Sequence, residues 1–175
     1  IGLAVYATKV DLQPSSSTWH TAMPNDTLYI KEKGQYLIKI TQIGKFHFEQ
    51  TTKDTIDLRI QGNNIKDLKV VNNQPSTDTL NVTFRNLLVY NKHIWGYYGE
   101  TLRLLNDTCN INICFKGENT LLSTASALIQ ITGETPSLNF IGKEGKITMS
   151  THSAHYNILT EVSEHDNITY NFANI

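Results

Sequence analysis

The chain of 175 residues is 39% hydrophobic and 18% charged, and its formal net charge is −1. This length fits one folded domain, residues 1–175, and the scattered charges contain no basic stripe that would bind a phosphate backbone. No apolar run approaches the roughly 20 residues of a membrane-spanning helix, so we expect a soluble domain with neither nucleic acid nor membrane insertion.

Apolar and polar residues alternate with a period of two along most of the chain, which is typical of strands with one buried face. The first two such runs flank Glu32-Lys33-Gly34, and this short polar segment predicts a tight turn between paired strands. Clusters rich in Gly, Asn and Pro separate the later runs. The alternating runs are 27–31, 35–41, 56–60, 80–85, 102–104, 111–115, 127–131, 147–149 and 168–172.

Helical periodicity is weak, and the strands are many and short. This pattern predicts an all-β fold, which we interpret as a two-sheet antiparallel jelly-roll sandwich. After Gly133 the strands become shorter and more polar. Residues 133–175 are therefore a candidate C-terminal extension of additional short strands.

Two stretches carry a resemblance to a known family. In residues 24–43 a short strand precedes a G-x-Y-x-I pattern, and residues 99–131 hold a glycine-acidic turn followed by two strands. In this order the stretches resemble the tumour-necrosis-factor/C1q-like jelly-roll superfamily over about half of the chain. The chain after Ile131 departs from that family, whose closing strand lies near the end of the domain.

The resemblance implies a compact trimer in which one sheet edge of each subunit lies near a three-fold axis. Under this hypothesis Tyr29, Tyr36 and Leu37 are candidates for the oligomer interface. Tyr29 and Leu37 lie on the second face of their strands, where an apolar side chain also needs burial. The alternative is that each is an isolated surface residue.

The most conspicuous candidate for ligand binding is an aromatic segment framed by glycines. Its candidate residues are His93, Trp95, Tyr97 and Tyr98, on an expected connecting loop. Trp and Tyr rings stack on a sugar face or anchor a protein partner, because they combine a large apolar area with a polar group. The alternative is that Trp95 fills one end of the sandwich.

No nucleophile elbow, phosphate-binding glycine loop or zinc-protease helix occurs in the sequence, so we expect neither an enzyme nor a bound cofactor. His152 and His155 would point to opposite faces of a strand, and no metal site is expected. Cys109 and Cys114 are interpreted as buried free thiols rather than a disulfide. The carboxylates are scattered and form no local pair: Asp54, Asp57, Glu100, Asp107, Glu161 and Glu164.

These observations predict a non-catalytic recognition or attachment head, trimeric, extracellular, and displayed on a phage or viral particle or on a bacterial cell surface. It would bind a glycan or a cell-surface protein. A second hypothesis is a structural capsid or fibre component whose apolar faces serve assembly only. A third is a carbohydrate-active enzyme that uses Glu100 beside the aromatic residues.

Overall fold

The computed structural model describes residues 8–74, 78–92, 99–124, 127–151, 157–162 and 167–171, with the backbone alone for residues 70, 162 and 167–171. In these ranges the chain forms strands and one short helix. Their bounds are β1 Lys9–Asp11, β2 His20–Thr21, β3 Thr27–Ile30, β4 Gln35–Ile40, β5 Gly44–Gln50, β6 Asp57–Asn63, α1 Leu68–Val71, β7 Thr79–Arg85, β8 Leu88–Asn91, β9 Leu102–Asp107, β10 Asn110–Ser123, β11 Ile129–Gly133, β12 Ser137–Thr151, β13 Ile158–Val162 and β14 Asn167–Asn171.

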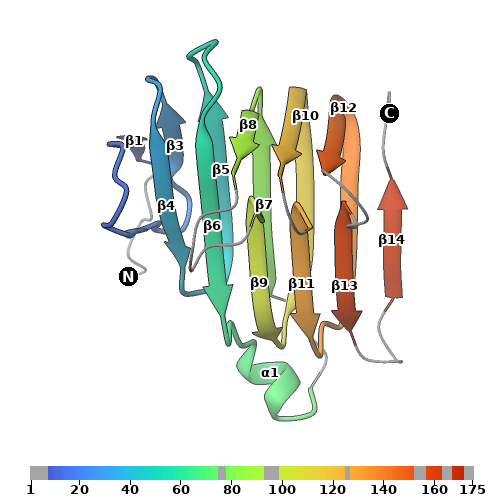
Figure 1. The fold of residues 1–175 in the computed structure, drawn as a ribbon. Coiled ribbons are helices and arrows are strands. Elements are labelled where there is room, and N and C mark those ends of the chain that lie inside the picture. Colours follow the sequence, from blue (N-terminus) through green and yellow to red (C-terminus); the bar gives the residue numbers. More distant parts are fainter. Residues whose placement is uncertain are drawn as a thin grey trace.

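The strands form two sheets that face each other (Figure 1). Sheet A has the order β1-β3-β5-β7-β10-β12-β14, with β8 also paired to β10, and sheet B has the order β13-β11-β9-β6-β4-β2. Every pair of neighbouring strands in the described residues is parallel.

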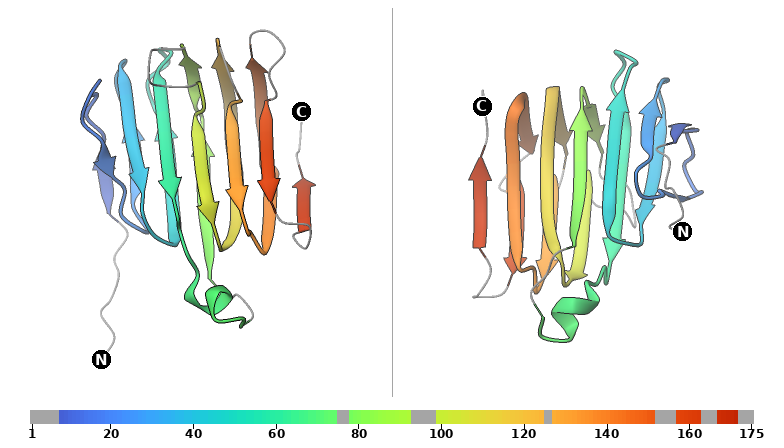
Figure 2. Two further views of the ribbon diagram at one scale, coloured as in Figure 1. Left: turned by 60° about the horizontal axis from the view of Figure 1, so that its bottom comes forward. Right: turned by 180° about the vertical axis from the view of Figure 1, so that it is seen from behind.

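Apart from β7 and β8, which both lie in sheet A, consecutive strands alternate between the two sheets, so neighbouring strands of one sheet are separated in sequence by a strand of the other. Each round of one strand in sheet A and one in sheet B forms a coil, and the coils stack in chain order from β1 to β14 (Figure 2). This architecture is a parallel β-solenoid. The helix α1 projects beyond the strand ends on one side of the stack (Figure 1).

The prediction of a strand-rich fold is confirmed, but the antiparallel jelly-roll sandwich is wrong. The segment Glu32-Lys33-Gly34 connects β3 in sheet A to β4 in sheet B. These two strands do not pair, so the segment is not the hairpin turn that the sequence predicted. Each solenoid strand has one face toward the core and one toward solvent, so its sequence alternates with a period of two like that of an antiparallel strand. The jelly-roll fold implied by the family resemblance is wrong for the same reason.

The core consists of inward-facing side chains stacked in register from coil to coil. In sheet A, Leu28, Phe48, Phe84 and Phe115 occupy matching positions on β3, β5, β7 and β10. The ring centroids of neighbouring phenylalanines lie 6.1 and 6.0 Å apart in tilted or edge-on contact, which is favourable for aromatic rings. Sheet B supplies a matching aliphatic stack of Ile38, Ile60, Leu102 and Ile129.

Buried asparagine side chains complete the hydrogen bonding where the coils bend. The side chain of Asn119 accepts a hydrogen bond from the backbone N–H of Leu87 at 2.9 Å and donates to the carbonyl of Lys116 at 3.0 Å. A longer bond of 3.4 Å reaches the carbonyl of Lys146 in the next coil. Because buried backbone groups need partners, Asn119 joins three coils at this corner.

The segment after Gly133 takes part in the same architecture. β12 pairs with β10, β13 pairs with β11, and β14 pairs with β12. Side chains of β12, such as Leu138 and Phe140, belong to the same hydrophobic core as the earlier coils. In the described ranges no helix has the length and apolar character needed to cross a membrane.

Candidate functional site

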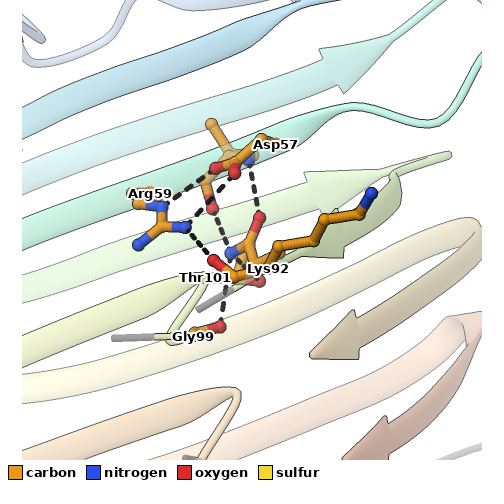
Figure 3. A network of polar contacts seen from close by, with 7 residues as sticks. Asp57, Arg59, Lys92, Gly99 and Thr101 are labelled. Atoms are coloured by element: carbon orange, nitrogen blue, oxygen red, sulfur yellow. Dashed lines mark hydrogen bonds and ion pairs between the residues drawn. The ribbon is translucent and has the colours of Figure 1, made fainter. Parts of the chain in front are cut away.

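A buried arginine on the outward face of sheet B holds the chain where it leaves β8. Arg59 of β6 is only 1% exposed, and its guanidinium donates two hydrogen bonds to the carboxylate of Asp57, at 2.9 and 3.2 Å (Figure 3). The same guanidinium donates a bond of 2.7 Å to the carbonyl oxygen of Lys92. A buried guanidinium requires such partners, so it fixes Lys92 against β6.

A buried asparagine ties both flanks of the segment 93–98 to β6. The side-chain oxygen of Asn91 accepts the backbone N–H of Leu58 at 3.0 Å, and its amide donates to the Leu58 carbonyl at 2.8 Å. The amide also reaches the Gly99 carbonyl at 3.3 Å and the Thr101 hydroxyl at 3.4 Å, on the far side of the segment (Figure 3).

The four candidate ligand-binding residues lie outside the described residues. These are His93, Trp95, Tyr97 and Tyr98. The structure describes the two ends of their segment, and Asn91 and Arg59 hold these ends close to β6.

An exposed tyrosine stands immediately before this segment. Tyr90 of β8 is 38% exposed and is the one aromatic residue among the large exposed hydrophobic side chains of the described chain. It lines an open hollow of about 410 Å³, together with Gln35, Asp57 and the two lysines Lys33 and Lys92. The ammonium of Lys92 lies 5.6 Å from the centroid of the Tyr90 ring, within range of a cation–π contact.

The three residues proposed for an oligomer interface have different surroundings. Tyr29 is half-buried on sheet A, with the Lys31 ammonium 5.7 Å from its ring centroid. Tyr36 and Leu37 of β4 are 1% and 2% exposed within the single chain. The Tyr36 hydroxyl donates to the Glu32 carbonyl at 2.6 Å, and burial raises its pKa. The trimer remains a prediction.

Of the carboxylates considered for catalysis, Glu164 lies outside the described residues, and among the others only Asp57 lines the Tyr90 hollow. Asp57 lines the hollow and forms an ion pair with Arg59, whereas Asp107 is buried at the far end of β9. Glu100 is also buried. In the described part of the chain no group of three His, Cys, Asp or Glu residues is arranged to hold a metal ion. His152 and His155 lie outside it.

Both cysteines are free thiols, Cys109 buried and Cys114 half-buried. Burial, together with a smaller contribution from the nearby carboxylates of Asp107 and Asp67, raises the pKa of Cys109 to about 12. The pKa of Cys114 is also raised by burial. The nucleophilic form of a cysteine is the thiolate, so both side chains are held in the unreactive form at neutral pH.

Comparisons with protein-family models, with curated proteins and with solved structures found no match. They leave the family resemblance of residues 24–43 and 99–131 untested. The site is therefore interpreted from its own geometry.

Sequence reasoning missed the three residues that organise this site, Arg59, Tyr90 and Asn91. Arg59 occupies an outward position in an alternating strand, where a charged residue normally indicates contact with solvent. Tyr90 and Asn91 come shortly before the aromatic segment. Their proximity to it in the sequence was the one signal that could have marked them as residues of the site. The hydrogen bonds of Asn91 to Leu58 join positions far apart in sequence, and no local pattern reports them.

Proposed function

We propose that this β-solenoid is a non-catalytic glycan-binding module, and that the hollow beside Tyr90 receives the sugar. The observation that carries this proposal is the position of an exposed aromatic ring in a hollow that five polar or charged residues also line, beside Gly34 and Ile56. An aromatic face supplies apolar contact to the C–H groups of a sugar ring. The surrounding amide, carboxylate and ammonium groups suit the hydroxyl groups.

The neighbouring aromatic segment supports this proposal. His93, Trp95, Tyr97 and Tyr98 follow Tyr90 within a few positions, and both flanks of their segment are bound to β6 next to the hollow. Additional rings presented from such a segment would extend the contact with a saccharide. A segment fixed at both ends also loses less conformational entropy when a ligand binds.

A non-catalytic role fits the charges around the hollow. A glycosidase requires two carboxyl groups at a set separation, one of which changes its protonation during the reaction. Asp57 is the one carboxylate among the described residues of the hollow, and its two oxygens accept hydrogen bonds from Arg59. The Asp57 carboxylate is thus held by Arg59, and the described residues of the hollow supply no second carboxyl group for a catalytic pair.

The experiment is a glycan array followed by titration calorimetry with the best-bound oligosaccharide. We expect Tyr90→Ala to weaken binding at least tenfold through loss of the stacking contact. Tyr29→Ala is the matched control, because Tyr29 also lies under a lysine two positions later but does not line the hollow. Equal affinities for the wild type and Tyr90→Ala would refute the proposal.

A second candidate function is a structural component that acts only in assembly. The exposed apolar side chains Leu68 and Val71 on α1 favour it, because an apolar surface is covered when copies associate. Sedimentation over a range of concentrations distinguishes the two. Self-association that Leu68→Lys abolishes, together with no glycan binding, would support the structural role.

A further inference from the structure

A second hollow lies on the outward face of sheet B, at the C-terminal ends of β4, β6 and β9. It is a shallow groove of about 330 Å³. Its polar and charged lining residues are Lys39, Thr41, Gln61, Asn63 and Arg103. Ile40, Gly62 and Leu105 also line it.

The parallel register places the charged side chains of the groove in one row. Lys39 is paired with Gln61, and Gln61 with Arg103, on three successive strands. Adjacent strands lie about 4.8 Å apart, so the backbones of Lys39 and Arg103 are about 10 Å apart with the Gln61 amide between them. This stacking follows from the solenoid and brings together residues that are distant in sequence.

Among the described residues that line the groove, Lys39 and Arg103 are cationic. None of the described residues that line it is acidic. On the outward face of sheet A two cations are paired with carboxylates, Arg85 with Glu49 at 3.2 Å and Lys116 with Glu144 at 3.3 Å. The Lys39 ammonium instead lies 5.8 Å from the Trp19 ring centroid, a contact that leaves its charge uncompensated.

We propose that this groove binds the acidic group, carboxylate or sulfate, of an acidic saccharide. A guanidinium and an ammonium on either side of an amide match an anionic group, and charge-assisted hydrogen bonds are the strongest that such side chains form. The amides of Gln61 and Asn63 and the hydroxyl of Thr41 suit the neighbouring sugar hydroxyls. A nucleic acid fits less well, because two cations neutralise few phosphates.

This inference rests on the proposed glycan-binding function and specifies the class of glycan. The Tyr90 hollow and the groove lie toward opposite ends of β4 and β6, with Gln35 in the first and Lys39 in the second. Four residues of strand correspond to about 13 Å. The two hollows are therefore treated as separate subsites for one glycan, one for an apolar ring face at Tyr90 and one for an acidic group between Lys39 and Arg103.

The test is titration calorimetry with three probes: oligogalacturonate, a sulfated dextran oligosaccharide and neutral dextran of the same length. We expect the wild type to prefer one acidic probe over neutral dextran, with an affinity that falls as salt is added. Arg103→Gln and, separately, the exposed Lys39→Gln should each reduce that affinity at least tenfold. Lys45→Gln, on the outward face of sheet A, is the control and should have no effect.

The two proposals fail in different ways. If the groove variants bind acidic probes as the wild type does while Tyr90→Ala loses binding, the groove inference is wrong and the Tyr90 site stands. Binding of neutral sugars alone would likewise refute the groove and leave the Tyr90 site standing. A single-stranded DNA oligonucleotide bound as tightly as the acidic saccharides would also overturn the inference. Thermal unfolding of each variant checks folding, and Lys39→Gln decides the outcome if Arg103→Gln is unstable.

Discussion

At the scale of single residues, buried polar side chains hold successive coils together. Asn91, Asn119 and Asp107 are all buried, and each accepts a hydrogen bond from the backbone of a different strand or loop. Asp107 differs from the asparagines in carrying a titratable group. One of its oxygens accepts the N–H of Ile65 at 2.9 Å.

Asp107 makes the stability of the fold dependent on pH. Burial raises its pKa to about 7, whereas an unfolded aspartate has a pKa of about 3.9. The protonated carboxyl is favoured in the folded chain, so this contribution is complete below about pH 4 and is lost progressively as the pH rises to about 7. From pH 5 to pH 8 the loss should be about 2–3 kcal/mol.

Urea unfolding of the wild type and of Asp107→Asn at pH 5 and pH 8 measures this effect. The asparagine still offers an oxygen to Ile65 but has no charge to bury. We expect the wild type to lose stability relative to the variant as the pH rises. Parallel pH profiles would contradict the prediction, because they would mean that the pKa of Asp107 is the same in the folded and unfolded chain.

At the scale of elements, the long strands β10 and β12 bend where glycine pairs with glycine. Gly117 and Gly145 are register partners, and the pairing shifts just before them, between Cys114 and Lys116. A Cβ on Gly145 would lie 2.6 Å from the Phe115 carbonyl and 2.8 Å from the Gly117 carbonyl. Both obstacles are backbone atoms, which cannot move away without breaking the pairing of β10 with β12.

We therefore expect Gly145→Ala to destabilise the fold by about 1–3 kcal/mol, as overpacking of a close contact generally does. Thr148→Ala, an exposed position on the same strand, is the control and should change the unfolding free energy by less than about 1 kcal/mol. Chemical denaturation measures both. Equal effects of the two substitutions would show that the bend tolerates a side chain.

At the scale of the whole molecule, the parallel in-register stacking of coils distinguishes a solenoid from a sandwich. Thr83 of β7 and the free thiol residue Cys114 of β10 are register partners, and both are half-buried. Parallel neighbours have Cα atoms about 4.8 Å apart, within the range that a disulfide spans. A single substitution therefore tests the topology.

Thr83→Cys should form a disulfide with Cys114 under mild oxidation, detected as loss of both free thiols and by peptide mapping. Asn81→Cys is the matched control. It is offset by two residues from the partner of Cys114, so the Cα atoms lie about 8 Å apart, too far for the bond. If Thr83→Cys stays reduced, or if Asn81→Cys bonds equally well, the register of β7 and β10 is not the one described.

The stacking also explains why the repeat is invisible in the sequence. Asn81 pairs with Asn112, and Asn112 with Asn139, so the spacing of equivalent residues changes from coil to coil. A solenoid with coils of equal length would show a fixed period. Here α1 and loops of unequal length separate the strands, which removes the period and leaves only the alternation within each strand.

The sequence by itself determined where many of the strands lie and which of their side chains point inward, because a period of two reports that one face of a strand is buried. Ile111, Ile113 and Phe115 were assigned to one face on this basis, and all three are buried. The alternating runs did not include β5 or the full length of β10 and β12. The tertiary structure decided which strands pair and in which direction, because alternation carries no information about the neighbour. The tertiary structure also determined which residues form the candidate sites. Arg59 contacts Lys92, and Lys39 and Arg103 line one groove, only because the coils stack.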